Sequence, residues 1–456
     1  MAGVKSRLEA CGLTEDEIPA ALGPVANLDA VALHLRRPDV DVGHASLVRL
    51  FVLGEDVPAE TLPLPAAELE EAGLVEYNGG LVHATLRLAP AEGFLLAHDG
   101  EDHVRERDYV GGVNNATRTL STLTIREPVA RALDLGTGCG AQALLASRHA
   151  KAVVASDVNP RAIEIAGLNA RLNGIELELR EGSWFAPVGD DLFDLIVSNP
   201  PFVISPDSSF VFRDGGLDGD AVSRNVVRGA AAHLRDGGYA TILCNWICRN
   251  AAETWQPLEE WVDGTGCDAL LLAHEPVEPF SYAALWNEPL RRDREAYASG
   301  VERWLDYYER EGIAAIGIGA VVLRRREGNN RCRGFNLERP ATGHAGGHLL
   351  RLFAALDAPI VSDDAFLDGR YRLADGHSLD QSLRFENGRY SLDGVRVTLD
   401  DGIGLTATVD ATTLPLLFAL DPAQQLRNAL AEADVSETTA VSAMRGLFEQ
   451  GFLERL

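Results

Sequence analysis

Lysine is almost missing from this sequence: Lys5 and Lys151 are the only two in 456 residues, so arginine carries nearly all of the positive charge. Acidic residues outnumber lysine and arginine by 68 to 41, which gives a formal net charge of −27. Proteins that bind nucleic acid nonspecifically use a basic surface to neutralise phosphates. The charge balance therefore argues against nonspecific nucleic-acid binding, although a local arginine patch remains compatible with it.

Long apolar runs are absent too. No stretch reaches the roughly 20 apolar residues that a membrane-spanning helix requires, and residues 1–13 carry charges where a signal peptide would have an apolar segment. The six cysteines are scattered, without the spacing of a disulfide framework or a zinc site. The sequence therefore predicts a protein of the reducing cytoplasm, with no membrane segment and no metal site.

Residues 1–94 are predicted to form a first, mainly helical domain. It contains two helices followed by a hairpin, at 45–53, 65–72, 74–77 and 81–88, with Asn78-Gly79-Gly80 as the turn. This order is typical of a winged helix. The second helix carries three glutamates and no basic residue, so docking or dimerisation, including a homodimer, is favoured over DNA binding.

Residues 95–330 alternate predicted strands and helices, which is typical of a parallel sheet covered on both faces. The fold class expected here is a doubly wound α/β domain with a seven-stranded, Rossmann-like sheet. Its strands are expected at 130–135, 152–157, 177–181, 193–198, 239–244, 269–274 and 313–324. The last two strands enclose an insert at 275–311, whose Arg291, Arg292 and Arg294 are candidate contacts for an acidic or phosphate-bearing substrate.

Residues 335–456 are predicted to form a small C-terminal α+β domain. Short alternating segments indicate an antiparallel sheet, and they lie at 382–385, 389–392, 395–399 and 405–409. Asn387-Gly388 and Asp393-Gly394 are the expected turns, and a helical tail follows.

A glycine-rich turn follows the first strand of the middle region. Its residues are Asp134, Leu135, Gly136, Thr137, Gly138, Cys139 and Gly140. Glycines are needed where a ligand approaches the backbone closely. A carboxylate at Asp134 would repel a pyrophosphate but suits the ammonium of a methionine group, which favours S-adenosylmethionine over a dinucleotide as the cofactor.

A second acid, Asp157, ends the next strand about 20 residues further on. A carboxylate at this offset commonly accepts hydrogen bonds from ribose hydroxyls. Because both nucleoside cofactors contain a ribose, Asp157 supports the site without choosing between them.

Asn199-Pro200-Pro201-Phe202 follows the fourth strand, at the sheet edge where such folds bind ligands. An amide or aminopurine nitrogen is a poor nucleophile because its lone pair is delocalised. The side-chain carbonyl of Asn199 and the backbone carbonyl of Pro200 could accept its N–H bonds, while Phe202 offers a face for a planar group. Orientation would then supply most of the catalysis, without a metal or a strong base.

These segments together resemble class I S-adenosylmethionine-dependent methyltransferases. The nearest likeness is the group of the release-factor glutamine methyltransferases and the small-domain ribosomal-RNA guanine methyltransferases. The resemblance covers roughly residues 108–326 and implies a catalytic role for Asn199–Phe202. It also implies cofactor contacts along Asp157-Val158 and after the third strand. This sequence departs there from the family's acid, so Ser183 and Trp184 are the candidates for the adenine.

The sequence thus predicts a methyltransferase that acts on a planar nitrogen of a protein or RNA. One alternative is an N- or O-methyltransferase of a small natural product, as the winged-helix-like start suggests. A second alternative, from another class, is a noncatalytic cofactor-binding scaffold. The intact Asn199–Phe202 segment speaks against the scaffold, because a scaffold needs no carbonyl groups aimed at a methyl.

Overall fold

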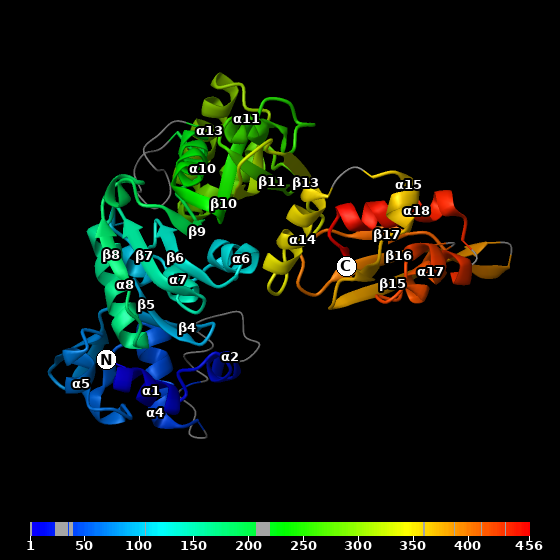
Figure 1. Ribbon diagram of the computed structural model, residues 1–456. Coiled ribbons are helices and arrows are strands. Elements are labelled where there is room, and N and C mark those ends of the chain that lie inside the picture. Colours follow the sequence, from blue (N-terminus) through cyan, green and yellow to red (C-terminus); the bar gives the residue numbers. More distant parts are fainter. Residues whose placement is uncertain are drawn as a thin grey trace. The chain divides into compact units, whose positions relative to one another are not determined.

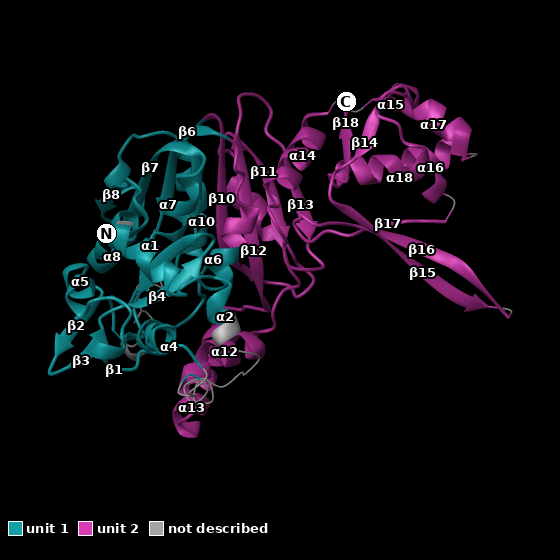
Figure 2. Cartoon of the chain, turned by 90° about the horizontal axis from the view of Figure 1, so that it is seen from below, with its two compact units in different colours: residues 1–118, 128–235 teal, residues 119–127, 236–456 magenta. Residues whose placement is uncertain are grey.

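The computed structural model describes residues 2–22, 35, 40–104, 106–206, 219–358, 361–386, 388–411, 413–433 and 435–456. Contacts divide the chain into two compact units (Figure 2). Unit 1 comprises residues 1–118 and 128–235, and unit 2 comprises residues 119–127 and 236–456. The predicted division into three sequence domains stays a prediction. No helix of the described ranges is long and apolar enough to cross a bilayer.

Unit 1 contains four parallel strands in the order β9-β6-β7-β8. Their bounds are Val129–Leu135 for β6, Ala150–Asp157 for β7, Glu178–Glu181 for β8 and Phe193–Ser198 for β9. Buried apolar runs in β6, β7 and β9 explain this placement, because a strand covered on both faces has few sites for polar side chains. The chain passes from β6 to β7 on one side and returns to β9 on the other, so the topological switch point lies between β6 and β9.

Helices α7 (Ala141–Ala146) and α8 (Pro160–Asn173) pack directly on these strands (Figure 1). Helix α8 begins where the sequence provides a cap, because the Asn159 side chain accepts a hydrogen bond from the Arg161 amide. It ends at Gly174, which adopts a left-handed conformation. The short 3-10 turn η4 (Ala186–Val188) precedes β9, and helix α10 (Ala221–His233) follows it.

The first residues of unit 1 form helices and small antiparallel sheets. The elements are α1 (Ala2–Ala10), α2 (Glu17–Leu22), α4 (Val42–Val48), the π-helix η1 (Arg49–Leu53), β1 (Val57–Pro58), η2 (Ala59–Thr61), α5 (Ala66–Glu71), β2 (Val75–Asn78) and β3 (Leu81–Ala84). The predicted hairpin is present. Asn78 pairs with Leu81, which leaves Gly79 and Gly80 as a two-residue loop. The predicted helix at 45–53 is an α-helix that continues as a π-helix. The winged-helix assignment stays a prediction.

The predicted strand 81–88 is interrupted, which corrects the sequence analysis. Strand β3 ends at Ala84, and a separate strand, β4 (Arg87–Ala91), pairs with β5 (Phe94–His98). This second hairpin is attached to helix α8 by two asparagines. Asn169 donates to the carbonyl and accepts from the amide of Ala97 at 2.9 and 2.7 Å, and Asn173 makes the same pair of bonds with Leu95 at 2.8 and 3.0 Å. The η3 turn (Glu101–His103) follows, and α6 (Asn115–Leu123) precedes β6.

Unit 2 contributes strands in the order β13-β11-β12-β10. Their bounds are Leu234–Cys248 for β10, which begins at the unit boundary, Cys267–Ala273 for β11, Ala315–Arg325 for β12 and Cys332–Asn336 for β13. All seven predicted strands are therefore present, and β13, which pairs in parallel with β11, is an eighth that the prediction lacked. Its sequence, Cys-Arg-Gly-Phe-Asn, has no apolar run that would identify a strand. The remaining elements before β13 are η5 (Gln256–Leu258), α11 (Glu259–Val262), α12 (Pro279–Asn287), η6 (Glu288–Leu290) and α13 (Arg294–Arg310).

The last part of unit 2 mixes helices and strands, in agreement with the predicted α+β composition. Its elements are α14 (Gly346–Asp357), α15 (Asp363–Leu367), β14 (Tyr371–Leu373), β15 (His377–Glu386), β16 (Arg389–Leu399), β17 (Ala407–Val409), α16 (Leu414–Ala419), α17 (Leu426–Ala433), α18 (Glu437–Glu449) and β18 (Leu453–Arg455). Strands β15 and β16 form a long ribbon (Figure 2). The expected turn at Asp393-Gly394 is wrong: β16 runs through it with a register shift, and Asp393 pairs with Arg384 across the ribbon. Asn387 of the other expected turn lies outside the described residues.

Candidate active site

A cavity of about 1120 Å³ lies at the carboxyl ends of β6, β7 and β9, and all of its described lining residues belong to unit 1. It brings together most of the site residues that the sequence predicts: Asp134, Gly136, Thr137, Gly138, Asp157, Val158, Ser183, Trp184, Asn199, Pro200 and Pro201. Gly140 and Phe202 are not among the lining residues. Segments far apart in the sequence thus meet at the switch point of the sheet.

The glycine-rich turn leaves its backbone open to the cavity. Gly136 and Gly138 have φ values of 74° and 54°, which favour glycine, and a Cβ atom at either position would meet no atom within 4 Å. Gly140 has a different task. A Cβ there would lie 3.1 Å from the Cβ of Ala166, so this glycine allows close packing against helix α8.

Asp134 is buried inside this turn, with 2% of its surface exposed. Its Oδ2 atom accepts hydrogen bonds from the Thr137 hydroxyl at 2.6 Å and from the Ala143 amide at 2.9 Å. Burial raises the pKa of Asp134 to about 7, although both hydrogen bonds oppose the shift. In the described part of the chain no cation pairs with this carboxyl group. A positively charged ligand would supply the missing partner, so the residue fits a sulfonium cofactor that also carries an ammonium group.

Asp157, at the end of β7, faces the same cavity. Its two oxygens accept from the amides of Gly138 and Asn159, each at 2.9 Å, and burial raises its pKa. The hydroxyl of Ser156 beside it is buried, lines the cavity and has no hydrogen-bond partner among the described residues. Asp157 and Ser156 therefore offer polar groups to a ribose.

The loop after β8 carries Ser183 and Trp184 to the cavity. Trp184 has a φ of 49°, a left-handed conformation that costs a non-glycine residue about 1–2 kcal/mol. Strain of this kind persists only where surrounding contacts impose it. Ser183 is exposed and Trp184 half-buried, so both are accessible to a ligand.

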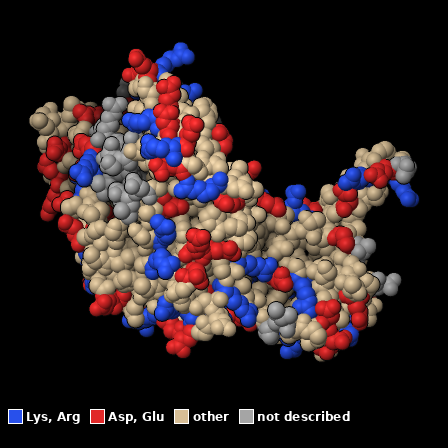
Figure 3. All heavy atoms as spheres, turned by 90° about the horizontal axis from the view of Figure 1, so that it is seen from above, with Lys and Arg blue, Asp and Glu red and all other residues tan. Residues whose placement is uncertain are grey.

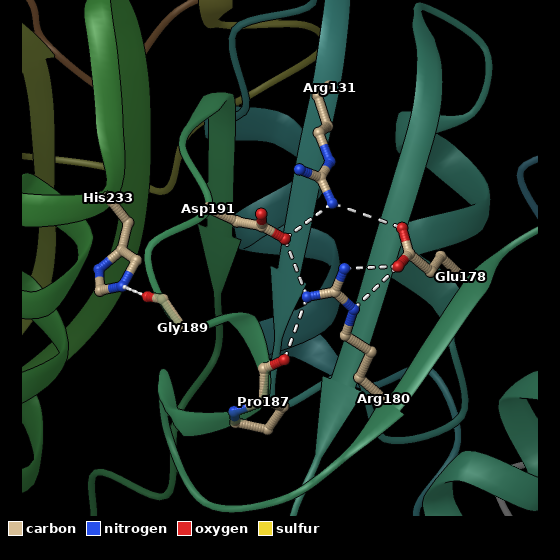
Figure 4. Close-up of polar contacts among 7 residues, drawn as sticks. All are labelled: Arg131, Glu178, Arg180, Pro187, Gly189, Asp191 and His233. Atoms are coloured by element: carbon tan, nitrogen blue, oxygen red, sulfur yellow. Dashed lines mark hydrogen bonds and ion pairs between the residues drawn. The ribbon is translucent and has the colours of Figure 1, made fainter.

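An ionic cluster at the amino ends of the strands holds this loop (Figure 4). Asp191 accepts from Arg131 and from Arg180, each at 2.9 Å, and Arg180 also donates to the Pro187 carbonyl at 3.1 Å. The bond from Arg131, followed by that from Arg180, lowers the pKa of Asp191. Figure 4 also shows His233 in contact with the Gly189 carbonyl, at 2.9 Å. The loop is thus fixed from the side opposite the cavity.

Asn199 directly follows β9, whose last residue, Ser198, donates a hydrogen bond to the Leu135 carbonyl at 2.8 Å. This bond fixes the end of β9 to the end of β6. The Asn199 side chain lines the cavity and makes no hydrogen bond to any described residue, so its amide is available to a ligand. Pro200 and Pro201 also line the cavity, and Phe202 is half-buried outside its lining.

Several residues between β5 and α6 line part of the cavity, and the sequence analysis missed most of them: Asp99, Gly100, Glu101, Arg107, Tyr109, Val110, Gly111 and Gly112. Asp99 is 1% exposed; its Oδ2 accepts from the Val110 amide at 2.8 Å, and the Arg161 guanidinium forks onto both of its oxygens. Asn159 adds a bond to the Asp108 carbonyl at 2.8 Å. Asp99 and Arg161 are 62 positions apart and Asp108 and Asn159 are 51 apart, so no local pattern identifies these two contacts. Asn114 also lines the cavity and accepts from the Thr117 amide at the start of α6.

The chain is similar to known methyltransferases over its middle part. The family model described as "methyltransferase small domain" matches residues 110–251. A release factor glutamine methyltransferase of Cereibacter sphaeroides is 40% identical over 137 residues, which is 27% of this chain and 49% of the relative. A ribosomal protein uL3 glutamine methyltransferase of Bradyrhizobium diazoefficiens is 39% identical over 128 residues, 24% of this chain and 39% of the relative.

A solved structure, the ribosomal protein L11 methylase of Lactobacillus delbrueckii subsp. bulgaricus, aligns over 35% of this chain and 72% of its own, with 24% identity and a TM-score of 0.26. The chain spans less than half the length of the two curated relatives named above. Residues 110–251 are thus similar to a methyltransferase domain, which confirms the predicted resemblance, and that resemblance implies S-adenosylmethionine as the cofactor.

Proposed function

We propose that this protein uses S-adenosylmethionine to methylate a planar amide nitrogen of a protein, with a glutamine side chain as the acceptor. The observation that carries this proposal is the meeting of Asn199–Pro201 with Asp134 and Asp157 in one cavity. The two curated relatives named above, which match the same segment, are glutamine methyltransferases. They support the amide as the acceptor group and a protein as its source.

When bound, S-adenosylmethionine supplies a methyl group on a positively charged sulfur, which makes that carbon an electrophile. The residues of this chain hold and orient it. The Asp134 carboxylate would pair with the ammonium group, and Asp157 with the ribose hydroxyls. The bare backbone at Gly136 and Gly138 lets the ligand approach, because no side chain fills that space. Ser183 and Trp184 are the proposed contacts of the adenine.

The acceptor amide would be held by two carbonyl groups, one from the Asn199 side chain and one from the Pro200 backbone. Each accepts one N–H bond, which fixes the plane of the amide and directs its nitrogen toward the methyl group. Consecutive prolines stiffen the backbone at this point. Holding two reactants in the correct geometry supplies a large part of the rate enhancement of such a transfer.

Nucleic acid is a less suitable acceptor than protein for this chain. On the face drawn in Figure 3, lysine and arginine atoms are interspersed with aspartate and glutamate atoms and form no broad basic area. The net charge of −27 points the same way. A small-molecule substrate and a noncatalytic scaffold remain as outcomes of the test below.

Incubation of the protein with labelled S-adenosylmethionine and an extract of cells that lack it tests the proposal. We expect the label in the protein fraction, on glutamine. Asn199→Ala should reduce the transfer rate by at least about 100-fold, because the acceptor loses one of its two positioning bonds, with cofactor affinity changed by less than about threefold.

Asn428→Ala, at an exposed asparagine of α17, is the matched control and should behave as the wild type. Label in RNA or metabolites alone would overturn the protein acceptor. A normal rate for Asn199→Ala would overturn the role of Asn199. Cofactor binding without transfer to any fraction would favour the scaffold.

A further inference from the structure

Strands β15 and β16 of unit 2 form a ribbon whose two faces differ in character. Residues directly opposite each other in an antiparallel pair point to the same face. In the outer half of the ribbon, residues 383–392, one face therefore carries two apolar pairs, Leu383–Leu392 and Phe385–Tyr390. This face is called here the apolar face. The opposite face carries charged and polar side chains, those of Arg384, Glu386, Arg389 and Ser391.

A β-bulge keeps the apolar side chains of β16 on one face. Leu392 and Val395 are three residues apart, an odd separation that places side chains on opposite faces of a regular strand. Leu392 pairs with Leu383, however, and Val395 pairs with Gln381, two residues before Leu383. Because Leu383 and Gln381 share a face of β15, their partners share it too, and Asp393 is the extra residue. The bulge thus continues the apolar face of the inner half into the outer half.

The two halves of this face have opposite surroundings. In the inner half, Val395 and Val397 are fully buried. In the outer half, Leu383, Phe385 and Tyr390 expose 61%, 59% and 70% of their surface. The rings of Phe385 and Tyr390 lie against each other, with centroids 4.9 Å apart, and Figure 2 shows this half extending away from the helices of unit 2. An apolar strip of this kind, left open to solvent, is typical of an interaction surface.

The charges of the ribbon are matched within it. Residues 377–399 contain three acids and three arginines, so this segment is neutral in a chain with a net charge of −27. The Arg384 guanidinium donates to both carboxylate oxygens of Asp393, at 2.8 and 3.0 Å. The other opposite charges face each other across the ribbon, Asp380 with Arg396 and Glu386 with Arg389. A strongly charged partner therefore gains little at this surface.

This charge distribution favours a second copy of the chain as the occupant. Two copies repel each other over their acidic surfaces, but they approach at a neutral ribbon with the smallest electrostatic cost. A basic partner would be drawn to the acidic surfaces instead. A second copy also presents, by symmetry, an apolar face of the same shape and width.

We propose that two copies of this protein associate through the outer halves of their ribbons, apolar face against apolar face, about a twofold axis. Face-to-face stacking is how two sheets commonly bury their apolar sides. Pairing through the edge of β15 would leave Leu383, Phe385 and Tyr390 exposed, so it would not cover the apolar face. The inference is independent of the proposed function, because the ribbon contributes no residue to the cavity.

The size of the apolar face predicts a weak dimer. Four apolar side chains at these exposures present about 400 Å² per chain. Together with the rim of the ribbon, stacking would bury roughly 1,000 Å² in total, which is at the low end for a specific interface. We therefore expect a dissociation constant in the micromolar range and a reversible equilibrium between monomer and dimer.

Sedimentation velocity of the full-length protein, from about 1 to about 100 µM, tests the proposal. We expect the mass to rise with concentration from that of one chain to that of two. Tyr390→Gln should raise the dissociation constant at least about tenfold, because an aromatic side chain is lost from the contact. Phe385→Gln, on the other strand, should have the same effect.

Phe418→Gln is the matched control. Phe418 of α16 is also 70% exposed and lies outside the ribbon, so its replacement should leave the dissociation constant unchanged. Thermal unfolding of the monomers at about 1 µM shows that the variants are folded. We expect unfolding temperatures within about 2 °C of the wild type, because the replaced side chains are exposed in the monomer.

A wild type that stays monomeric at the highest concentration overturns the proposal. A dimer whose dissociation constant is the same in Tyr390→Gln and Phe385→Gln also overturns it, because the contact then lies on another surface. If the wild type is monomeric and Tyr390→Gln reduces methyl transfer to the protein fraction, the apolar face binds the methyl acceptor, and the second copy is excluded as its occupant.

Discussion

Charged residues gather at both ends of the parallel strands of unit 1, but their surroundings are opposite. At the carboxyl ends, Asp134 and Asp157 are largely buried, no cation pairs with them in the described ranges, and burial raises their pKa values. At the amino ends, Asp191 accepts bonds from both Arg131 and Arg180, which lower its pKa (Figure 4). An aspartate thus lacks a paired cation at the carboxyl ends, whereas an aspartate at the amino ends is paired with two arginines.

This difference shows how a binding site can be told from a structural ion cluster. A carboxylate that is desolvated without a cation is costly in the unliganded fold, and a cationic ligand removes that cost. A carboxylate between two arginines already has its partners, and it contributes to the fold. The absence of a paired cation, more than the presence of a carboxylate, marks the carboxyl ends of the strands as the candidate site.

The largest effect is expected for Asp134→Asn, which removes the unmet charge and keeps the shape. Affinity for S-adenosylmethionine should fall by about 100-fold, because a buried charge-assisted bond is lost. The unliganded protein should not be destabilised at pH 8. A raised carboxyl pKa gives stability that is present below about pH 4 and is lost as the pH rises through about 7. Calorimetry measures the affinity for S-adenosylmethionine, and thermal unfolding measures the stability. Unchanged affinity would contradict the role of the Asp134 charge in ligand binding.

The affinity of the wild type should also depend on pH. The Asp134 pKa of about 7 means that most of the carboxyl groups are protonated at pH 6 and most are ionised at pH 8. Since the ionised form binds the cation, affinity should rise about tenfold between these values. Asp134→Asn should flatten this profile to the contribution of Asp157. If the affinity of the wild type and of Asp134→Asn depended on pH in the same way, a group other than Asp134 would cause the pH dependence.

Two glycines of the turn sharpen the comparison further. Alanine at Gly136 or Gly140 adopts a left-handed conformation at a cost of about 1–2 kcal/mol in either case. Gly136→Ala should also weaken cofactor binding about fivefold, because its methyl group enters the cavity. Gly140→Ala should leave binding nearly unchanged and lower the unfolding temperature more, because its methyl group presses on Ala166. The reverse pattern in the two measurements would contradict the assignment of the turn.

The smallest effect is expected at the amino ends. Asp191→Asn keeps the hydrogen bonds in part but removes the charge between Arg131 and Arg180. We expect a slightly lower unfolding temperature and a cofactor affinity within twofold of the wild type. The stability that Asp191 contributes should fade as the pH falls through its lowered pKa, because protonation removes the charge that the arginines favour. A tenfold loss of affinity would show that this cluster belongs to the site.

The sequence predicted the part of the fold that local patterns encode. Buried apolar runs identified β6, β7 and β9, and glycines followed by a helix identified the turn between β6 and α7. Strand β13 was missed because its five residues include a cysteine, an arginine, a glycine and an asparagine. The Asp393-Gly394 pair was read as a turn because that dipeptide favours one, but pairing of the flanking residues with β15 overrides this preference.

The site was predicted only where its residues follow strand ends. That Asp134, Asp157 and Asn199 line one cavity could be predicted because parallel strands bring their carboxyl ends to one edge, and the roles of these residues stay predictions. The cavity lining contributed by the β4–β5 hairpin was missed because it depends on Arg87 pairing with His98 across the hairpin, and on the bonds that join the hairpin to α8. Neither contact has a signature in one sequence. The arginines first considered for an acidic substrate lie in the insert, where Arg291 is exposed and pairs with Glu288.

The paired amide bonds of Asn169 and Asn173 to β5 bear on how this protein can be re-engineered. Each asparagine side chain accepts from a backbone amide and donates to a backbone carbonyl of β5, as the backbone of a neighbouring strand would. The side chains of an α-helix thus take the place of a strand beside the β-hairpin. The β4–β5 hairpin, whose Arg87, Ala89 and His98 line the cavity, is thereby tied to the helix that follows Asp157. Grafting the β4–β5 hairpin onto another domain of this fold would therefore require both asparagines in the recipient helix, so the hairpin and the helix would be exchanged only as a matched pair.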